Sequence, residues 1–188
     1  VLEILREALY DAVRKTVPET SFAIAFSGGI DSSLLARICT DLGKRVTLVT
    51  VGFADSHDIQ FSKKIARMLG LEHHVAELDF SGFELDLAYV RRTITCGNTS
   101  HIENCIAYLN IAKTVTAKGM NLVLSANGCD ELFCGYNAYR AVYDKGKDAI
   151  MKFMEEKISN ELTLVQEISQ VAKEYGVQVK QPFLSADF

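Results

Sequence analysis

The sequence predicts an α/β domain in which a parallel sheet is covered by helices on both sides and is followed by a helical C-terminal part. Two observations support this prediction: short apolar runs alternate with longer segments of helical periodicity, and glycine-containing turns follow several of the apolar runs. A chain of 188 residues suits a single domain with one core. Within it we expect an N-terminal helix at 1–17, an α/β core at about 18–136 and a helical part at about 137–188.

The first five elements alternate helix and strand and are expected at 2–16, 21–26, 32–43, 45–53 and 58–70. The strands are continuous apolar runs, which is typical of strands buried on both faces. The helices repeat apolar residues every three or four positions, which predicts one buried face on each helix. The residues expected on these buried faces are Leu2, Leu5, Leu9, Ala12, Val13, Leu34, Leu35, Ile38, Leu42, Phe61, Ile65, Met68 and Leu69.

The next four elements continue the pattern, with a strand at 72–78, helices at 82–95 and 102–118, and a strand at 120–126. Strands joined by helices predict right-handed crossovers and a parallel sheet. From about residue 137 the periodicity is helical almost to the end, and its apolar positions are Ile150, Phe153, Met154, Ile158, Leu162, Val165, Ile168 and Ala172. Residues 177–184 are expected to be extended, because Pro182 disfavours helix in the residue that precedes it.

The overall composition is typical of a soluble globular protein, with 48% apolar residues, 23% charged residues and a net charge of −4. The negative charge argues against nucleic acid as the main partner. No apolar run reaches the roughly 18 residues of a membrane span, and no signal peptide pattern opens the sequence. The five cysteines include no C-x-x-C pair, which predicts a reduced, cytoplasmic protein. The first residue is Val1, and whether the chain is a piece of a longer protein stays open.

The turn "SGGIDSS" at 27–33 lies between the first predicted strand and the helix that follows it. Its glycines let a ligand approach closely, and its backbone N–H groups form a concave anion site with the start of the helix. A carboxylate beside polyphosphate is repulsive unless a cation lies between them, so Asp31 implies Mg²⁺. A plain tight turn with Asp31 near the helix start is the alternative. The combination S-G-G-x-D-S, in this context, favours the phosphate site.

The stretch "LVLSANGCDELFCGY" at 122–136 places a glycine turn and two acidic residues, Asp130 and Glu131, after another strand. Taken alone, these residues indicate a helix start, because acidic residues are favoured in the first turn of a helix. The loops at 27–32, 52–57 and 125–136 all follow strands, so we expect them at one edge of the parallel sheet. Ligands of such sheets bind at that edge, beyond the carboxyl ends of the strands.

Both loops resemble segments of one enzyme superfamily. "SGGIDSS" resembles the pyrophosphate loop of the N-type ATP pyrophosphatases. "LVLSANGCDELFCGY" resembles the segment L-S-G-E-G-[SA]-D-E-[LV]-F-G-G-Y of the synthetase domain of asparagine synthetases, and "QPFLSADF" resembles its V-P-F-L-D segment. The resemblance covers roughly residues 20–188 and implies a three-layer, adenine nucleotide α-hydrolase-like (Rossmann-like) fold.

The resemblance also implies ATP and Mg²⁺ as ligands. The residues that would bind the nucleotide are Ser27, Gly28, Gly29, Asp31, Ser32, Ser33, Val51, Gly52, Ser125 and Ala126. Asp31 and Asp130 match the metal-binding aspartates of the family, and the expected catalytic residues are Asp130, Asn127 and Glu131. In these enzymes a substrate carboxylate attacks the α-phosphate of ATP and pyrophosphate leaves. Ammonia then displaces AMP from the acyl-adenylate and forms an amide.

Two departures from the family pattern concern the amide-forming step. Asn127 stands where the family segment has a glutamate that handles protons, which makes Glu131 and His101 the next candidates for that role. Ser185 replaces the aspartate of the V-P-F-L-D segment. The alternative function is therefore a non-catalytic or regulatory protein that binds ATP or AMP and has lost the amide-forming step.

The expected partners are ATP and a small carboxylate substrate, with no membrane. No segment resembles a glutaminase or contains the later catalytic lysine of the family, so ammonia or a separate amidotransferase subunit is the expected nitrogen source. The acceptor substrate and the oligomeric state stay open, a homodimer being one option.

Several other side chains have simpler explanations. His73 and His74 are adjacent in a predicted strand and therefore face opposite sides of it. Cys129 and Cys134 flank the second acidic loop, where a soft metal is the weaker alternative to structural thiols. The polar stretch at 96–104 either faces the site or leads into a helix.

Overall fold

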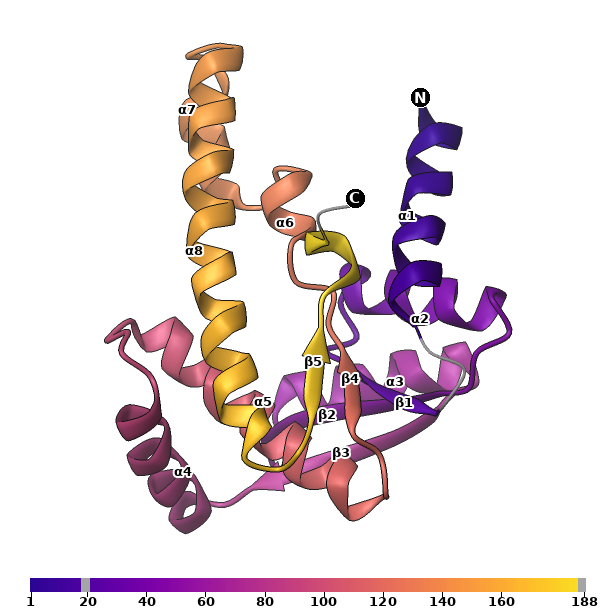
Figure 1. Cartoon of the computed structure of the whole chain (residues 1–188), viewed down its shortest axis with the longest axis vertical. Helices are drawn as coiled ribbons and strands as arrows, with labels where there is room; N and C mark the ends of the chain where they lie inside the picture. The colour runs from indigo at the N-terminus through magenta and orange to yellow at the C-terminus, as the bar shows by residue number, and fades with distance from the viewer. Residues whose placement is uncertain (18–20, 186–188) are drawn as a thin grey trace.

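The fold is a five-stranded parallel sheet covered on both faces by helices (Figure 1), in a computed structural model that describes residues 1–17 and 21–185. The strand order is β3-β2-β1-β4-β5, and every pairing is parallel. The strands are β1 (Phe22–Ala25), β2 (Val46–Phe53), β3 (Glu72–Leu78), β4 (Leu122–Leu124) and β5 (Gln178–Lys180). The predicted parallel sheet is confirmed. The order of the strands reverses between β1 and β4, which places a crevice at the carboxyl ends of these two strands.

The helices form two layers around the sheet. On one face lie α1 (Leu2–Thr16), α2 (Ile30–Asp41) and α3 (His57–Leu69), and on the other lie α4 (Phe80–Thr93), α5 (Thr99–Ala117) and α8 (Lys147–Lys173). Short elements complete the chain: α6 (Cys129–Leu132), the 3-10 turn η1 (Asn137–Tyr139), α7 (Arg140–Tyr143) and the 3-10 turn η2 (Pro182–Leu184). The expected three-layer arrangement is confirmed.

The central strand β1 shows why its sequence is apolar throughout. Phe22 and Ile24 pack into the core on the α1–α2–α3 side, whereas Ala23 packs into the core on the α5–α8 side. The register places Ile24 beside Leu48 of β2 and Leu124 of β4, so these three side chains form one buried row across the sheet. Alternate residues of a strand point to opposite faces, and here both faces are buried.

The C-terminal part agrees with the sequence prediction in one respect and differs from it in another. Residues 177–184 were expected to be extended, and they contain the strand β5, which pairs with β4 through Leu124 and Lys180. Residues 182–184 of the same stretch instead form the turn η2. The sequence did not indicate the pairing of β5, because its partner in the sheet lies more than fifty residues earlier in the chain. The resemblance of "QPFLSADF" extends to residues 186–188, which lie outside the described residues, as do residues 18–20.

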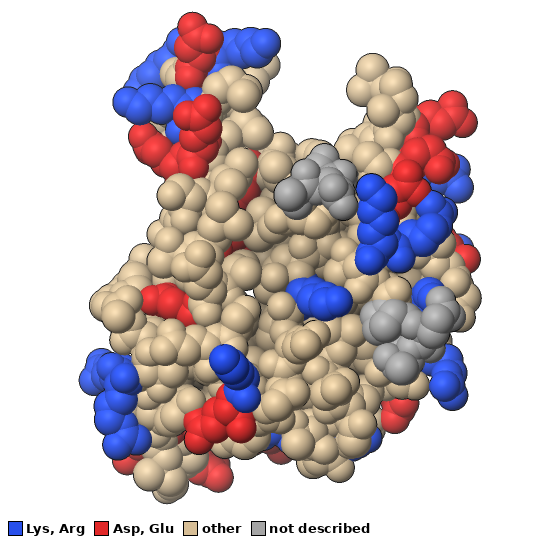
Figure 2. Space-filling view, in the orientation of Figure 1, with Lys and Arg blue, Asp and Glu red and all other residues tan. Residues whose placement is uncertain are grey.

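Two helices project from the carboxyl-end side of the sheet. Figure 1 shows α8 and α1 standing apart, and Figure 2 shows a hollow between their projecting ends. In this view charged side chains of both signs cover the outer end of the α8 projection, whereas the tip of the α1 projection carries none. Within the described residues, no helix has the length and apolar character needed to cross a membrane.

Candidate functional site

A cavity of about 680 Å³ opens at the carboxyl ends of β1, β2 and β4. Its floor includes residues of these strands, and its walls come from the start of α2, the first half of α5, α6 and the middle of α8. The cavity therefore occupies the crevice that the strand order creates between β1 and β4.

The turn after β1 is held by its own hydroxyl groups. Gly29 donates its backbone N–H to Ser27 Oγ at 3.1 Å, and Ser32 Oγ donates to the Gly29 carbonyl at 3.3 Å. Gly28 has a φ of +80°, and a Cβ there would lie 3.0 Å from the Cα of Ser62. A side chain at this position would be strained and crowded, because α3 passes directly behind the turn. Gly29 is the N-cap of α2 and brings no side chain to the free N–H groups of the first helical turn.

The structure brings most of the expected site residues together and places the others behind them. The residues that line the cavity are Ser27, Asp31, Ser32, Val51, Ser125, Ala126, Asn127, Asp130 and Glu131. Gly28, Gly29, Ser33 and Gly52 are absent from the lining of this cavity in the described structure. Ser33 Oγ donates to the Gly28 carbonyl at 3.3 Å, and a Cβ on Gly52 would lie 3.2 Å from Ile59 Cγ1. These residues shape the turns that carry the lining residues.

Three carboxylates from the two loops, Asp31, Asp130 and Glu131, line the same cavity. Burial raises the pKa of Asp31, and the charges of Asp130 and Glu131 raise it further. Asp130 occupies the space that a side chain at Gly135 would need, so glycine at that position leaves room for the carboxylate. Burial raises the pKa of the neighbouring Cys129 thiol to about 12, which keeps this thiol neutral. A group of partly buried, mutually repelling carboxylates suits a divalent cation with phosphate oxygens.

Glu131 is buried and tied to the segment that follows it. Tyr136 donates its hydroxyl to Glu131 Oε1, and Tyr139 donates its hydroxyl to the Glu131 carbonyl at 2.9 Å. Burial and the adjacent Glu131 carboxylate raise the pKa of Tyr136, which keeps it a donor. Glu131 therefore lines the cavity and also anchors the chain between α6 and α7.

Asn127 belongs to a buried hydrogen-bond network that the sequence did not reveal. Its Oδ1 accepts from Tyr108 at 2.9 Å and from the Ser125 hydroxyl, and its Nδ2 donates to Glu161 on α8. Glu161 is 6% exposed, and burial raises its pKa. Tyr108 and Glu161 both line the cavity. The sequence signal that could have indicated this network is Glu161 itself, an acidic residue that lies three positions before Leu164 on the buried face of α8.

Replacing Glu161 by glutamine should make the free energy of unfolding higher than that of the wild type at about pH 8. The pKa of Glu161 is raised above its ordinary 4.5, so the stability that its protonated form contributes is present below that pH and is lost as the pH rises. The advantage of the glutamine variant, on the order of 1 kcal/mol, should therefore shrink to zero below pH 4.5. Urea unfolding of both proteins between about pH 4 and pH 8 measures this difference in the free energy of unfolding.

The matched control is Glu155→Gln on the same helix, because Glu155 is exposed and the change in charge is identical. The free energy of unfolding of this control should differ from that of the wild type by the same amount at every pH. A Glu161→Gln variant that is less stable than wild type at every pH would contradict the burial of an ionisable carboxylate at this position.

The polar stretch at 96–104 both faces the cavity and leads into a helix. Asn98 caps α5 by accepting from the Ser100 backbone N–H at 2.9 Å, and Asn98, Ser100, His101 and Asn104 line the cavity. Among the described residues, the group of three or more His, Cys, Asp or Glu side chains whose ligand atoms all lie within 4.8 Å of one another is Cys96, His101 and Glu167. Cys129 and Cys134 are not in that group.

The two adjacent histidines have separate partners. The ring of His73 lies 2.8 Å from Thr50 Oγ1, and the ring of His74 lies 2.7 Å from Glu72 Oε1. Neither histidine belongs to the lining of the cavity.

Comparison with known proteins identifies the family. The sequence profile described as "Asparagine synthase" matches residues 4–183. The chain belongs to the asparagine synthase family. This confirms the resemblance carried by the turn at Ser27–Ser33 and by the stretch that contains Asp130 and Glu131.

Relatives within the asparagine synthase family match almost the whole chain. A "Putative asparagine synthetase [glutamine-hydrolyzing] 1" from Methanocaldococcus jannaschii is 27% identical over 188 residues, which cover 98% of this chain and 35% of that protein. An "Asparagine synthetase [glutamine-hydrolyzing]" from Asparagus officinalis is 24% identical and is matched over 98% of this chain and 33% of its own length. The chain thus spans about a third of the length of these relatives.

Among solved structures, the fold is shared with an NMN synthetase from Francisella tularensis. The TM-score is 0.50 at 23% identity, over 70% of this chain and 58% of that one. The shared fold agrees with the adenine nucleotide α-hydrolase-like class expected for this asparagine synthase family member.

Proposed function

We propose that this domain uses ATP to adenylate a small carboxylic acid, releases pyrophosphate, and then forms an amide with ammonia. The proposal rests on one observation: the glycine turn after β1 and the acidic loop after β4 line the same cavity, where the charge of Asp130 helps to raise the pKa of Asp31. A triphosphate on the turn would place its negative charge beside these two carboxylates. The membership of the asparagine synthase family supports the same reaction class.

The residues of the cavity fit Mg²⁺, and Asp31 and Asp130 would hold it. When bound, the cation neutralises and orients the phosphate oxygens of ATP. The N–H groups at the start of α2 bind phosphate oxygens, because a helix N-terminus carries partial positive charge. The hydroxyls of Ser27 and Ser32 fix the shape of this turn before ATP arrives. The protein's contribution to adenylation is therefore positioning and charge stabilisation.

The acceptor acid would bind at the part of the cavity lining that α5 and its N-cap provide. Asn98, Ser100 and Asn104 line the cavity, and their amide and hydroxyl groups can bind a polar substrate. The curated relatives are named as glutamine-hydrolysing asparagine synthetases, which supports ammonia from a glutaminase as the nucleophile. We propose aspartate as the first acid to test.

The rival function, a nucleotide-binding protein without the amide-forming step, was favoured by Asn127. Glu161 weakens that argument, because it places a buried carboxylate directly against Asn127 in the same cavity. The site therefore still combines an amide, a tyrosine hydroxyl and a carboxylate at the position where the family segment has glutamate.

The decisive experiment is exchange of radiolabelled pyrophosphate into ATP in the presence of Mg²⁺ and a panel of small carboxylic acids that includes aspartate. The proposal expects exchange that depends on one of the acids and on Mg²⁺. Tight ATP binding without exchange for any acid would instead favour the rival function.

A further inference from the structure

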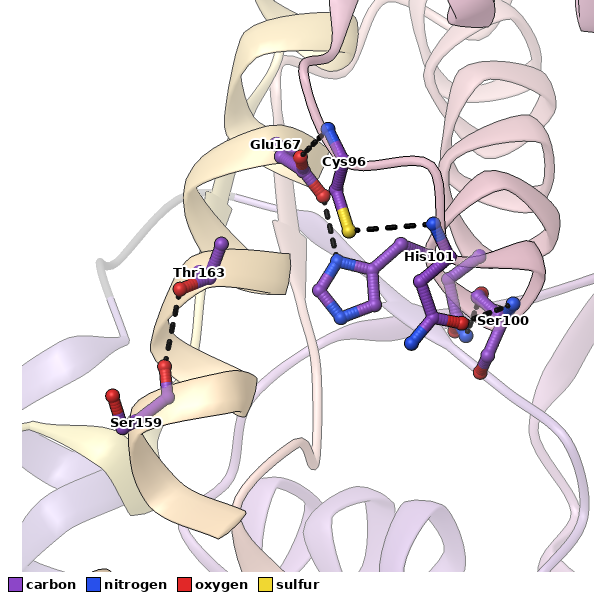
Figure 3. Close-up of polar contacts among 8 residues, drawn as sticks. Cys96, Ser100, His101, Ser159, Thr163 and Glu167 are labelled. Atoms are coloured by element: carbon purple, nitrogen blue, oxygen red, sulfur yellow. Dashed lines mark hydrogen bonds and ion pairs between the residues drawn. The ribbon is translucent and has the colours of Figure 1, made fainter. Parts of the chain in front are cut away.

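A buried imidazole–carboxylate pair lies at the edge of the cavity, and its histidine is part of the cavity lining. His101 on α5 and Glu167 on α8 are 2% and 5% exposed, and His101 Nδ1 lies 2.7 Å from Glu167 Oε2. Glu167 Oε1 also accepts the backbone N–H of Cys96 at 3.0 Å. Figure 3 shows Glu167 reaching from α8 to both partners. The carboxylate is thus fixed at both oxygens, and it fixes the imidazole.

The free nitrogen of this imidazole is available to a ligand. Because Glu167 accepts at Nδ1, the neutral ring carries its proton there and presents a lone pair at Nε2. Nε2 is buried and, within the described structure, has no hydrogen-bond partner. Figure 3 shows the ring with this nitrogen pointing away from Glu167, and His101 is part of the cavity lining. A buried polar atom without a partner costs stability, which indicates a role with a bound molecule.

The charges around His101 select the kind of molecule. His101 and Glu161 both line the cavity, and Glu167 holds the Nδ1 side of the imidazole. His101 is therefore hydrogen-bonded to one carboxylate of α8 and shares the cavity with another. A lone pair at Nε2 accepts a hydrogen bond from an N–H donor and repels phosphate and carboxylate oxygens. Ammonia, or another small neutral amine, is such a donor and keeps the nitrogen lone pair that the attack needs.

We propose that His101, oriented by Glu167, receives the proton of the amine nucleophile in the amide-forming step. This rests on the proposed function. The nitrogen lone pair attacks the carbonyl carbon of the acyl-adenylate and forms the C–N bond, while one N–H proton moves to His101 Nε2. The bond from the carbonyl carbon to the AMP oxygen then breaks, and AMP leaves with that electron pair. The imidazolium is stabilised by Glu167 until the proton passes to solvent. Glu167 is a positioning residue in this scheme.

A metal ion held by Cys96, His101 and Glu167 is the competing interpretation, because their ligand atoms lie within 4.8 Å of one another. Ligands on a common zinc ion sit about 2.0–2.3 Å from the metal, which keeps them farther apart than a hydrogen-bonded pair. The separation of 2.7 Å between Nδ1 and Oε2 is that of a hydrogen bond. Cys96 contacts Glu167 through its backbone N–H, so its thiol is not needed for the pair.

The geometric half of the proposal is tested by nitrogen NMR of the histidine rings, which distinguishes the two neutral tautomers. The chain has four histidines, and His101→Gln identifies the resonance of interest. We expect His101 to be protonated at Nδ1 in the wild type and to lose this preference in Glu167→Gln. A wild-type ring protonated only at Nε2, or stoichiometric zinc that is lost in Cys96→Ser, would overturn the proposal.

The chemical half is tested by measuring the two half-reactions separately. For His101→Gln, circular dichroism first shows that the variant is folded, and the rate of amide formation is then expressed relative to the rate of pyrophosphate exchange of the same variant. The rate of amide formation from ammonium chloride should fall by about a hundredfold to ten-thousandfold. Glu167→Gln should lower kcat for amide formation without changing KM for ATP. Equal rates of amide formation in wild type and His101→Gln would refute a role in proton transfer.

Cys96→Ser is the matched control, because it keeps the backbone N–H that Glu167 accepts. It should leave both half-reactions nearly unchanged, whereas a metal site would make it as damaging as His101→Gln. If the wild type shows no pyrophosphate exchange with any acid, the proposed function fails. The NMR measurement then still decides whether His101 has the orientation that the inference requires.

Discussion

Replacing Asp31 by asparagine should lower the rate of pyrophosphate exchange by about a hundredfold or more and should remove most of the Mg²⁺ dependence of ATP binding. Asparagine keeps the size of the side chain but removes the charge that a cation needs between it and the phosphates. Asp31 is one of three carboxylates that line the cavity, and its pKa is raised by burial and by the other two. Its ionised form therefore destabilises the free protein as the pH rises, so the variant should be at least as stable as wild type at neutral pH.

The matched control is Asp144→Asn, which makes the same change in charge at an exposed residue far from the cavity lining. Exchange rates with and without Mg²⁺, together with the free energy of unfolding, are measured for both variants. If Asp31→Asn binds ATP with the metal dependence of the wild type, Asp31 does not lie beside the phosphates.

Replacing Gly128 by alanine should lower the free energy of unfolding by about 2–4 kcal/mol. Gly128 has a φ of +104° and a ψ of −21°, which strains any residue with a Cβ. A Cβ would also lie 2.6 Å from Leu184 Cγ and 3.3 Å from the Phe183 carbonyl. Phe183 is fully buried in the core next to α1 and cannot shift freely. The substitution therefore combines backbone strain with overpacking.

Urea unfolding measures this effect, and the double variant Gly128→Ala with Leu184→Ala separates the two causes. Removing the Leu184 side chain should restore the part of the stability that was lost to overpacking. Gly97→Ala is the control, because a Cβ there would meet nothing within 4 Å. Equal stability of wild type and Gly128→Ala would mean that the turn η2 does not pack against the loop after β4.

The sequence was sufficient to predict the parallel sheet and the edge at which the two loops meet. The apolar runs that became β1, β2 and β4 are local signals, because a strand buried on both faces must be apolar throughout. The position of each loop directly after a strand then placed Asp31 and Asp130 at the same edge. Their roles as metal ligands, and the cytoplasmic location of the protein, stay predictions.

Helical periodicity was less informative about which side chains are buried. Leu2, Leu34, Phe61 and Met68 were expected on buried faces, and all four are exposed. Periodicity identifies an apolar stripe, but burial requires another element to cover it. Leu2 lies in the projecting half of α1 and is 83% exposed.

The sequence by itself determined the layered architecture and the two loops, because these depend on patterns within a few neighbouring residues. Only the tertiary structure showed that β5 completes the sheet and that α8 buries Glu161 at the cavity and Glu167 against His101. The contacts that settle this, from Asn127 to Glu161 and from His101 to Glu167, join residues 34 and 66 positions apart. An acidic residue in a long helix is expected in solvent, where its charge is hydrated. It becomes buried here because a distant amide and a distant imidazole replace that water.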